Sequence, residues 1–219
     1  MSLGTYYSNG GSARSTIIED VIDYFKLDVE VKLKSDTPNY TDLFPLGKTP
    51  AFITSDGVKF HELLAVLPYV LKLAGKEGEG LLGKTEIEKT LVMSFLSFIN
   101  TDLMSAAVKP YLVSIGYIPY DEAVISQALK DSYSYLKYLD DILAKSKYFT
   151  NSEAPNMADF YFVKFLCMLS NDLYSEECAA KFPHVNNLIQ DVANNFELSK
   201  KVKGTKPTPN KLSFDAISK

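Results

Sequence analysis

The chain has 219 residues, of which 46% are hydrophobic and 12% aromatic. This composition is enough to build the core of one large or two small domains. A formal net charge of −4 and a pI near 5.3 argue against direct nucleic-acid binding, which requires a basic domain or a clustered basic face.

Other global features concern cysteines, leader and membrane segments. The two cysteines, Cys167 and Cys178, match no metal or redox spacing and do not suggest a secreted disulfide framework. Residues 1–11 lack the basic-then-apolar layout of a leader. We expect no apolar run of the ~20 residues that span a bilayer. The expected protein is therefore intracellular and cytoplasmic, and does not associate with membranes.

The first 46 residues predict a β-α-β arrangement. Residues 4–8 form a short strand, residues 9–12 a Gly-rich loop, and a helix then runs to about Phe25. That helix has two possible starts, because Thr16 and Glu19 could form a capping box while the loop could equally end near Ser12. A half-exposed strand over 27–33 follows, and one turn of helix is expected near 40–43. The apolar helix positions are Ile17, Ile18, Val21, Ile22 and Phe25.

The stretch from Phe44 to Ala74 predicts a hairpin followed by a helix. Asp56-Gly57 favours a tight turn between strands 51–54 and 58–61, because glycine accepts positive φ at no steric cost. Pro50 opens the first strand, where its missing N–H is tolerated. Its peptide bond is either an ordinary trans bond or a cis bond, which would leave the Thr49 backbone free to pair with an extended peptide. The helix would bury Leu63, Val66, Leu67, Val70, Leu71 and Leu73.

These elements predict two domains and a tail. Residues 1–76 form an α/β sandwich of thioredoxin-like topology, and the Gly-, Glu- and Lys-rich stretch 76–84 is the linker. Residues 84–200 form an all-α domain, and residues 201–219 form a basic, Pro-containing tail with little apolar content until Leu212 and Phe214.

Within the all-α domain the pattern predicts four main features. A helix over 85–108 carries the stripe Ile87, Leu91, Phe95 and Phe98, and prolines 110 and 119 bracket a break around Gly116. A second helix starts after Pro119. Asn156 caps a third helix and Asp159 reaches back to the cap, which gives Asp159 a folding role rather than a catalytic one. The last regular helix starts at residues 182–185.

Several motifs occur in the order found in one known family. Gly47-Lys48-Thr49-Pro50-Ala51-Phe52, the Asp-Gly hairpin, Glu62 with its Leu-rich helix and the capped Ala158-Asp159 helix resemble glutathione transferases over residues 1 to about 200. The resemblance implies the glutathione transferase fold, an α/β thioredoxin-like domain followed by a helical bundle. One branch of the family, the transferase-like domain of elongation factor one-B gamma subunits, resembles this chain at residues 1–7, 44–48, 93–102 and 181–185, although the tryptophans usual in that branch are absent.

The resemblance implies a glutathione site. Lys48, Thr49 and Pro50 would belong to this site, with the backbone of Thr49 pairing with the cysteinyl backbone of glutathione. Glu62 with the residue after it would hold the γ-glutamyl end. Leu63 occupies the position of a serine in the family and offers no hydroxyl to a carboxylate.

Two residues are candidates to activate the glutathione thiol by donating a hydrogen bond. Tyr7 occupies the position of the donor in tyrosine-type transferases, and its alternative is a strand tyrosine packed in the core. Ser12 lies in the loop that carries the donor in serine-type transferases, and its alternative is a loop or N-cap serine. His61 and His184 are too few and too scattered for a metal site, so we expect no metal and assign both structural roles.

Two functions follow from the resemblance. The first is a glutathione-binding protein that conjugates glutathione to electrophiles, weakly because of Leu63. The second is a non-catalytic docking module of the elongation factor gamma type, with translation elongation factor subunits as partners. A homodimer is expected in either case. Whether the chain is an enzyme stays open at this stage.

Overall fold

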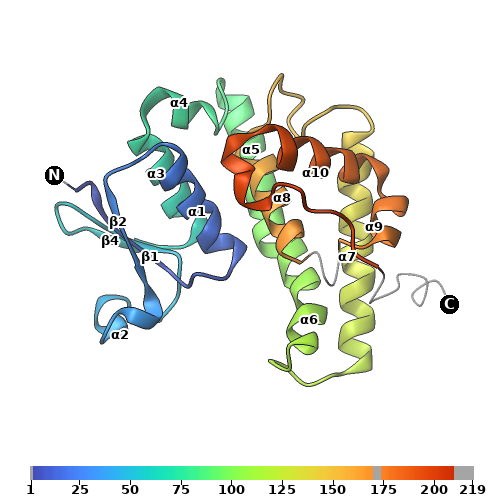
Figure 1. Cartoon of the computed structure of the whole chain (residues 1–219), viewed down its shortest axis with the longest axis horizontal. Helices are drawn as coiled ribbons and strands as arrows, with labels where there is room; N and C mark the ends of the chain where they lie inside the picture. The colour runs from blue at the N-terminus through green and yellow to red at the C-terminus, as the bar shows by residue number, and fades with distance from the viewer. Residues whose placement is uncertain (1, 170–173, 210–219) are drawn as a thin grey trace. The chain divides into compact units, whose positions relative to one another are not determined.

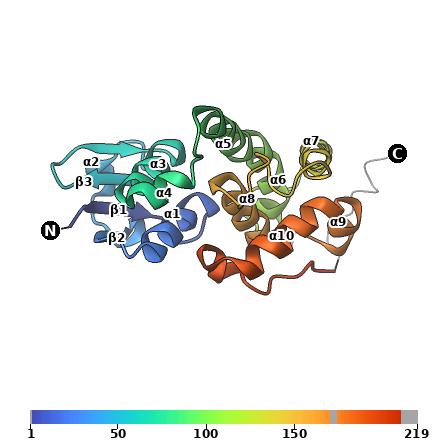
Figure 2. The same cartoon turned by 90° about the horizontal axis from the view of Figure 1, so that it is seen from above.

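The computed structural model describes residues 2–169 and 174–209. The chain divides into two compact units, Met1–Lys89 and Thr90–Lys219, which we call unit 1 and unit 2. We describe each unit by itself (Figures 1 and 2).

Unit 1 is built on a four-stranded sheet in the order β2-β1-β3-β4. β1 is parallel to β2 and antiparallel to β3, which is antiparallel to β4. This is the predicted thioredoxin-like arrangement, and Gly57 (φ 89°) makes the predicted tight turn between β3 and β4. The strands are β1 Gly4–Ser8, β2 Val29–Leu33, β3 Ala51–Thr54 and β4 Lys59–His61.

Helices cover both faces of this sheet. The Tyr6 hydroxyl donates to the carbonyl of Ser15 in α1 at 2.8 Å, so this face of β1 lies under α1, which packs against α3. Because side chains alternate along a strand, Tyr7 points to the other face and contacts Tyr40 of α2. The helical segments of unit 1 are α1 Ala13–Tyr24, η1 Lys34–Asp36, α2 Tyr40–Leu43, α3 Leu63–Leu73 and α4 Gly75–Gly80, the last inside the predicted linker.

The start of α1 settles the choice between its two predicted caps. Ser12 is the N-cap, and its side chain accepts a hydrogen bond from the amide of Ser15. The alternative capping box at Thr16 and Glu19 is wrong, because the Thr16 hydroxyl donates to the Ser12 carbonyl and Glu19 instead accepts from Ser8. The helix therefore begins directly after the Gly-rich loop.

Unit 2 is helical, with α8 at its centre. Figure 2 shows α8 between α5 and α10, and every residue of α8 from Met157 to Cys167 is buried. Figure 1 shows α7 running alongside α6, against which it packs. The helical segments are α5 Glu86–Phe98, which crosses the boundary between the units, the π-helical η2 Ile99–Leu103, α6 Met104–Ser114, α7 Glu122–Leu143, α8 Met157–Met168, α9 Glu176–Lys181, α10 Pro183–Asn195 and η3 Glu197–Val202.

Two predictions for the first helix of the all-α domain are wrong. The predicted helix end near Val108 is wrong, because the helical run continues through Pro110, which lies buried inside α6, where packing against α7 overrides the local penalty of proline. The predicted break around Gly116 is confirmed, since α6 ends at Ser114 and α7 begins at Glu122. The predicted inward stripe is also misplaced, since Ile87 is 72% exposed and Leu91 is 40% exposed. α5 is apolar on more than one face, so periodicity alone could not choose the buried one. The residues that face the core are Val92, Phe95, Leu96 and Ile99.

The same run of helix bears on the membrane expectation. Within the described residues, the continuous stretch Glu86–Ser114 is long and apolar enough to cross a membrane by length and composition. The expectation that no run would reach this length is therefore wrong by that measure. Residues Val92, Leu96, Ile99 and Leu103 of this stretch are fully buried in the chain, so core packing accounts for part of its apolar content.

The last described residues pack within unit 2. Leu198 and Val202 are buried, and the Thr208 amide donates to the Tyr174 carbonyl at 3.1 Å. The predicted tail from residue 201 is thus fastened to unit 2 as far as Thr208. Leu212 and Phe214, the apolar positions singled out in the sequence, lie outside the described residues.

The N-terminal cap of α8 is the predicted capping box of Asn156 and Asp159, and Asp159 makes one further hydrogen bond outside the cap. Asn156 accepts from the Ala158 amide, and the Asp159 carboxylate accepts from the Asn156 amide at 2.9 Å. Its other oxygen accepts from the Phe149 amide at 3.0 Å. Burial raises the pKa of Asp159 to about 7, against the lowering effect of these backbone hydrogen bonds.

This buried carboxyl predicts a pH dependence of stability. Because its folded pKa exceeds its ordinary value of 3.8, the contribution of Asp159 to stability is complete below pH 3.8 and is lost as pH rises through about 7. We expect the free energy of unfolding to fall over this range with a slope of up to ~1.4 kcal/mol per pH unit from this group. Urea unfolding at several pH values would measure it. Asp159→Asn should flatten the slope and the exposed-site control Asp42→Asn should not; equal slopes in all three proteins would contradict the assignment.

Candidate functional site

The candidate site lies at one edge of the sheet in unit 1. Tyr7 pairs with Ala51 across β1 and β3, and Ala51 pairs with His61 across β3 and β4. Because each of these pairs is antiparallel, the end of β1, the start of β3 and the end of β4 meet at the same edge. The register therefore brings together three segments that are distant in sequence: the loop after Ser8, residues 48–50 and residues 62–63.

The segment before β3 presents an unpaired backbone. The Thr49-Pro50 peptide bond is cis. The N–H and C=O of Thr49 form no hydrogen bond with the residues that the structure describes. The neighbouring carbonyls are held, because Lys48 accepts from the Tyr40 hydroxyl at 2.7 Å and Pro50 accepts from the Glu62 amide at 3.1 Å. Thr49 thus offers one donor and one acceptor between two fixed neighbours.

Glu62, at the start of α3, has a backbone conformation that L residues rarely adopt. Its φ is 80° and its ψ 138°, and such a conformation costs about 1–3 kcal/mol, which the surrounding structure must offset. The Glu62 amide bonds to Pro50, and the Glu62 carbonyl accepts from the amides of Ala65 and Val66. The carboxylate remains 65% exposed beside His61, at 3.2 Å from Nδ1. The constraint therefore fixes the Glu62 main chain beside Pro50 and leaves its carboxylate exposed.

The first turn of α3 supplies donors at the same edge. The amides of Leu63 and Leu64 have no hydrogen-bond partner within residues 2–169 and 174–209, and the N-terminus of a helix attracts anions. The Leu63 side chain is 1% exposed and belongs to the core. At position 63 it is therefore the backbone amide, and not the side chain, that is available at this edge.

Tyr7 packs among aromatic rings. It is 5% exposed, and its ring centroid lies 5.5 Å from that of Tyr40 and 5.7 Å from that of Phe44. Burial, together with the Tyr7 ring, raises the pKa of Tyr40 to about 12. The structure thus places Tyr7 in a small core on the α2 face, in agreement with the alternative of a strand tyrosine packed in the core. Tyr7 is the last residue but one of β1.

The loop after β1 is held by side chains. Ser12 caps α1, and its hydroxyl donates to Asn9 Oδ1 at 3.1 Å. Asn9 Oδ1 also accepts from the amides of Gly11 at 3.1 Å and Ser12 at 3.0 Å. Ser8 Oγ accepts from the Gly10 amide at 2.8 Å and donates to Glu19. The Asn-Gly-Gly-Ser run predicts a flexible loop, whereas these side-chain bonds hold residues 9–12 in a turn.

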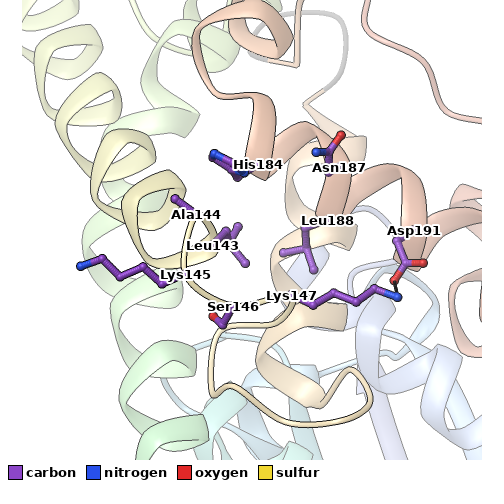
Figure 3. A pocket seen from close by; sticks show the side chains of 9 residues that line it. All are labelled: Leu143, Ala144, Lys145, Ser146, Lys147, His184, Asn187, Leu188 and Asp191. Carbon is purple, nitrogen blue, oxygen red and sulfur yellow. Dashed lines mark ion pairs between the residues drawn. The ribbon is translucent and has the colours of Figure 1, made fainter.

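A separate hollow lies in unit 2, with a volume of about 480 Å³. Figure 3 shows Lys147 reaching Asp191 while Lys145 points the other way; the ion pair is 3.1 Å long. Burial opposes ionisation of Asp191, but bonds from Asn195, Tyr148 and Lys147 lower its pKa. None of the predicted binding or catalytic residues lines this hollow, and the described residues contain no group of three metal-ligating side chains. The lining residues are Leu143, Ala144, Lys145, Ser146, Lys147, His184, Asn187, Leu188 and Asp191.

Comparison with known proteins supports the fold and the family. The N-terminal domain of glutathione S-transferases matches residues 2–72, and their C-terminal domain matches residues 123–200. A glutathione S-transferase Y-2 from Pichia kudriavzevii is 33% identical over 69% of this chain and 76% of its own length. Elongation factor 1-gamma 2 from Saccharomyces cerevisiae is 31% identical over 88% of this chain, which spans about half (47%) of that protein.

Solved structures agree on the fold. The GST-like domain of elongation factor 1-gamma from Saccharomyces cerevisiae superposes with a TM-score of 0.83 at 23% identity, covering 97% of this chain and 99% of that domain. A glutathione S-transferase from Pichia kudriavzevii gives 0.73 at 28% identity, covering 92% and 96%. Together with the two matching domains and the 33% identical relative, these similarities show that the chain belongs to the glutathione S-transferase family.

Proposed function

We propose that this chain binds glutathione at the sheet edge of unit 1 and activates its thiol for slow addition to electrophiles. The observation that carries the proposal is the unpaired backbone of Thr49 at the same edge as Glu62, whose main chain is constrained and whose carboxylate is exposed. Glutathione is an extended tripeptide with a charged group at each end. Its binding requires a backbone partner for its main chain and charged or polar groups near its ends.

The donor set fits glutathione group by group. The Thr49 N–H and C=O would pair with the cysteinyl backbone, as an added strand does. The γ-glutamyl end carries an ammonium group, which Glu62 would hold, and a carboxylate, which the free amides of Leu63 and Leu64 would hold. Lys48 is exposed and would meet the glycine carboxylate. Tyr7 and Ser12 remain the sequence-derived candidates for activating the thiol.

A homodimer is part of the proposal. An apolar strip on unit 2, formed by Leu91 and Phe98 of α5 with Tyr135 and Tyr138 of α7, is only partly covered within the chain. Tyr138 is 52% exposed, and the strip borders two hollows of about 550 and 360 Å³. Contiguous exposed aromatic surface is typical of protein interfaces, so we propose that a second copy covers this strip.

A second candidate function rests on the match to elongation factor 1-gamma over 88% of the chain. In this alternative the chain is a non-catalytic docking module whose partners are translation elongation factor subunits. The two functions differ in one cheap measurement, because only the first requires that the wild-type protein bind glutathione. Calorimetry at micromolar to low millimolar glutathione makes the distinction, and an absence of binding would favour docking.

Replacing the carboxylate at position 62 tests the placement of the site. We expect Glu62→Ala to weaken glutathione binding at least tenfold, since a charge-assisted bond to the ligand ammonium is worth about 1.5–3 kcal/mol. Glu62→Gln, which keeps the size of the side chain, should lose affinity through the charge alone. Isothermal calorimetry measures both, with the exposed Glu77→Ala as control. Unchanged affinity in Glu62→Ala would place the site elsewhere.

Restoring the family's hydroxyl at position 63 should not improve binding. Because the Leu63 side chain is buried, Leu63→Ser removes core volume, and we expect the free energy of unfolding to fall by about 2–5 kcal/mol. Urea unfolding measures the loss and calorimetry the affinity. A gain in glutathione affinity with stability intact would mean that this side chain faces the ligand.

A charge within the apolar strip should dissociate the dimer. We expect Leu91→Glu combined with Tyr138→Glu to shift the protein to a monomer, because unpaired carboxylates would be buried in the interface. Sedimentation equilibrium over a range of concentrations gives the mass. Tyr117→Ser, at a tyrosine that is 76% exposed outside the strip, is the matched control. A double variant that remains dimeric would exclude the strip as the interface.

A further inference from the structure

We propose that the side-chain amide of Asn9 is the group that donates a hydrogen bond to the thiolate of bound glutathione, in place of Tyr7 or Ser12. This inference rests on the proposed function and adds to it the residue that activates the thiol. Three observations carry it: the orientation of the Asn9 amide, its place at the same sheet edge as Thr49, and the commitments of the two competing hydroxyl groups.

The orientation of the Asn9 amide is fixed by its neighbours. Its Oδ1 accepts from the backbone amides of Gly11 and Ser12, at 3.1 and 3.0 Å. Backbone N–H groups can only donate, so the atom that they contact must be the oxygen. The nitrogen Nδ2 is then directed away from the turn. It has no partner among the residues that the structure describes, and Asn9 is exposed.

The register of the sheet puts Asn9 at the edge that holds the cysteinyl position. Gly4 pairs with Thr54 and Tyr7 with Ala51, so Asn9 and Thr49 each lie two positions beyond the last pair of the ladder, at the same end of β1 and β3. If Thr49 holds the cysteinyl backbone, the thiol belongs to the residue bound at this end of the strands. The binding group and the activating group would thus lie at the same edge.

The competing donors are less suited to the task. The proton of the Ser12 hydroxyl is directed to Asn9 Oδ1 at 3.1 Å, and the same oxygen accepts from the Ser15 amide as the N-cap of α1. Donating to a thiolate would break the first of these bonds. Tyr7 is 5% exposed among the rings of Tyr40 and Phe44. Asn9 alone of the three is exposed and has spare N–H groups within the described structure.

The chemistry requires no proton transfer from Asn9. The thiol of glutathione loses its proton to solvent, and the amide N–H stabilises the thiolate as a hydrogen bond to a charged acceptor. The N-terminus of α1 adds a favourable field, since thiolates are stabilised there. With 1-chloro-2,4-dinitrobenzene, the thiolate pair forms the S–C bond, the C–Cl bond breaks, and chloride leaves with its electron pair.

The test measures the pKa of the bound thiol from the ultraviolet absorbance of the thiolate as a function of pH. Asn9→Asp keeps an oxygen for the three bonds that hold the loop but removes the N–H donors, and Asn9→Ala removes both without adding charge. We expect both variants to raise the pKa of the bound thiol by one pH unit or more, and to lower kcat at neutral pH at least tenfold. Tyr7→Phe and Ser12→Ala should leave that pKa unchanged.

Binding measurements separate the possible failures. S-methylglutathione has no thiol, so its affinity for both Asn9 variants should match the wild type and would show that the site is intact. A wild-type protein that binds no glutathione would overturn the proposed function. Intact binding with an unchanged thiol pKa in Asn9→Ala and Asn9→Asp would overturn the role of Asn9 alone, as would a raised pKa in Tyr7→Phe.

Discussion

The candidate site depends on the antiparallel pairing of β1 with β3 and of β3 with β4. Main-chain hydrogen bonds set a register in which Tyr7, Ala51 and His61 lie side by side. A slip of one residue would turn every side chain of a strand to the other face. It would place Tyr6 among the rings of Tyr40 and Phe44 and remove it from α1. The core on both faces of the sheet therefore fixes the edge at which the segments carrying residues 9, 49 and 62 begin or end.

The polar bonds at that edge support one another. The Glu62 amide bonds to the Pro50 carbonyl, the Tyr40 hydroxyl holds the Lys48 carbonyl, and Asn9 holds the turn that leads to Ser12. Each of these bonds fixes a neighbour of a group that stays unpaired within the described residues, so the free donors and acceptors are held in place before a ligand arrives. Such preorganisation reduces the entropy lost on binding. The strained backbone of Glu62 sets the direction in which its side chain leaves the main chain at this edge.

Unit 2 relies on a different constraint, which is the burial of an entire helix. α8 is buried on every face from Met157 to Cys167, so its first turn can reach little water and must find its partners inside the protein. The Asp159 carboxylate accepts hydrogen bonds from the Asn156 amide at the cap and from the Phe149 amide in the preceding loop. The predicted folding role of Asp159 thus extends from a local cap to the anchoring of the loop before α8.

Much of this protein could be predicted from its sequence, because the signals concerned are local. The Asp56-Gly57 turn, the strand positions, the cap at Asn156 and Asp159, and the order of an α/β half before a helical half depend on residues close together in the chain. The tertiary structure decided what depends on distant partners. It chose the buried face of α5, where apolar residues occur on several sides, and kept Pro110 inside a helix that packs against α7. It also turned Leu63 into the core and Tyr7 into an aromatic cluster, while directing the amide of Asn9 outward. Residue type and spacing specify which groups are present, but the pairing register and the packing of neighbouring elements decide which of them face a ligand.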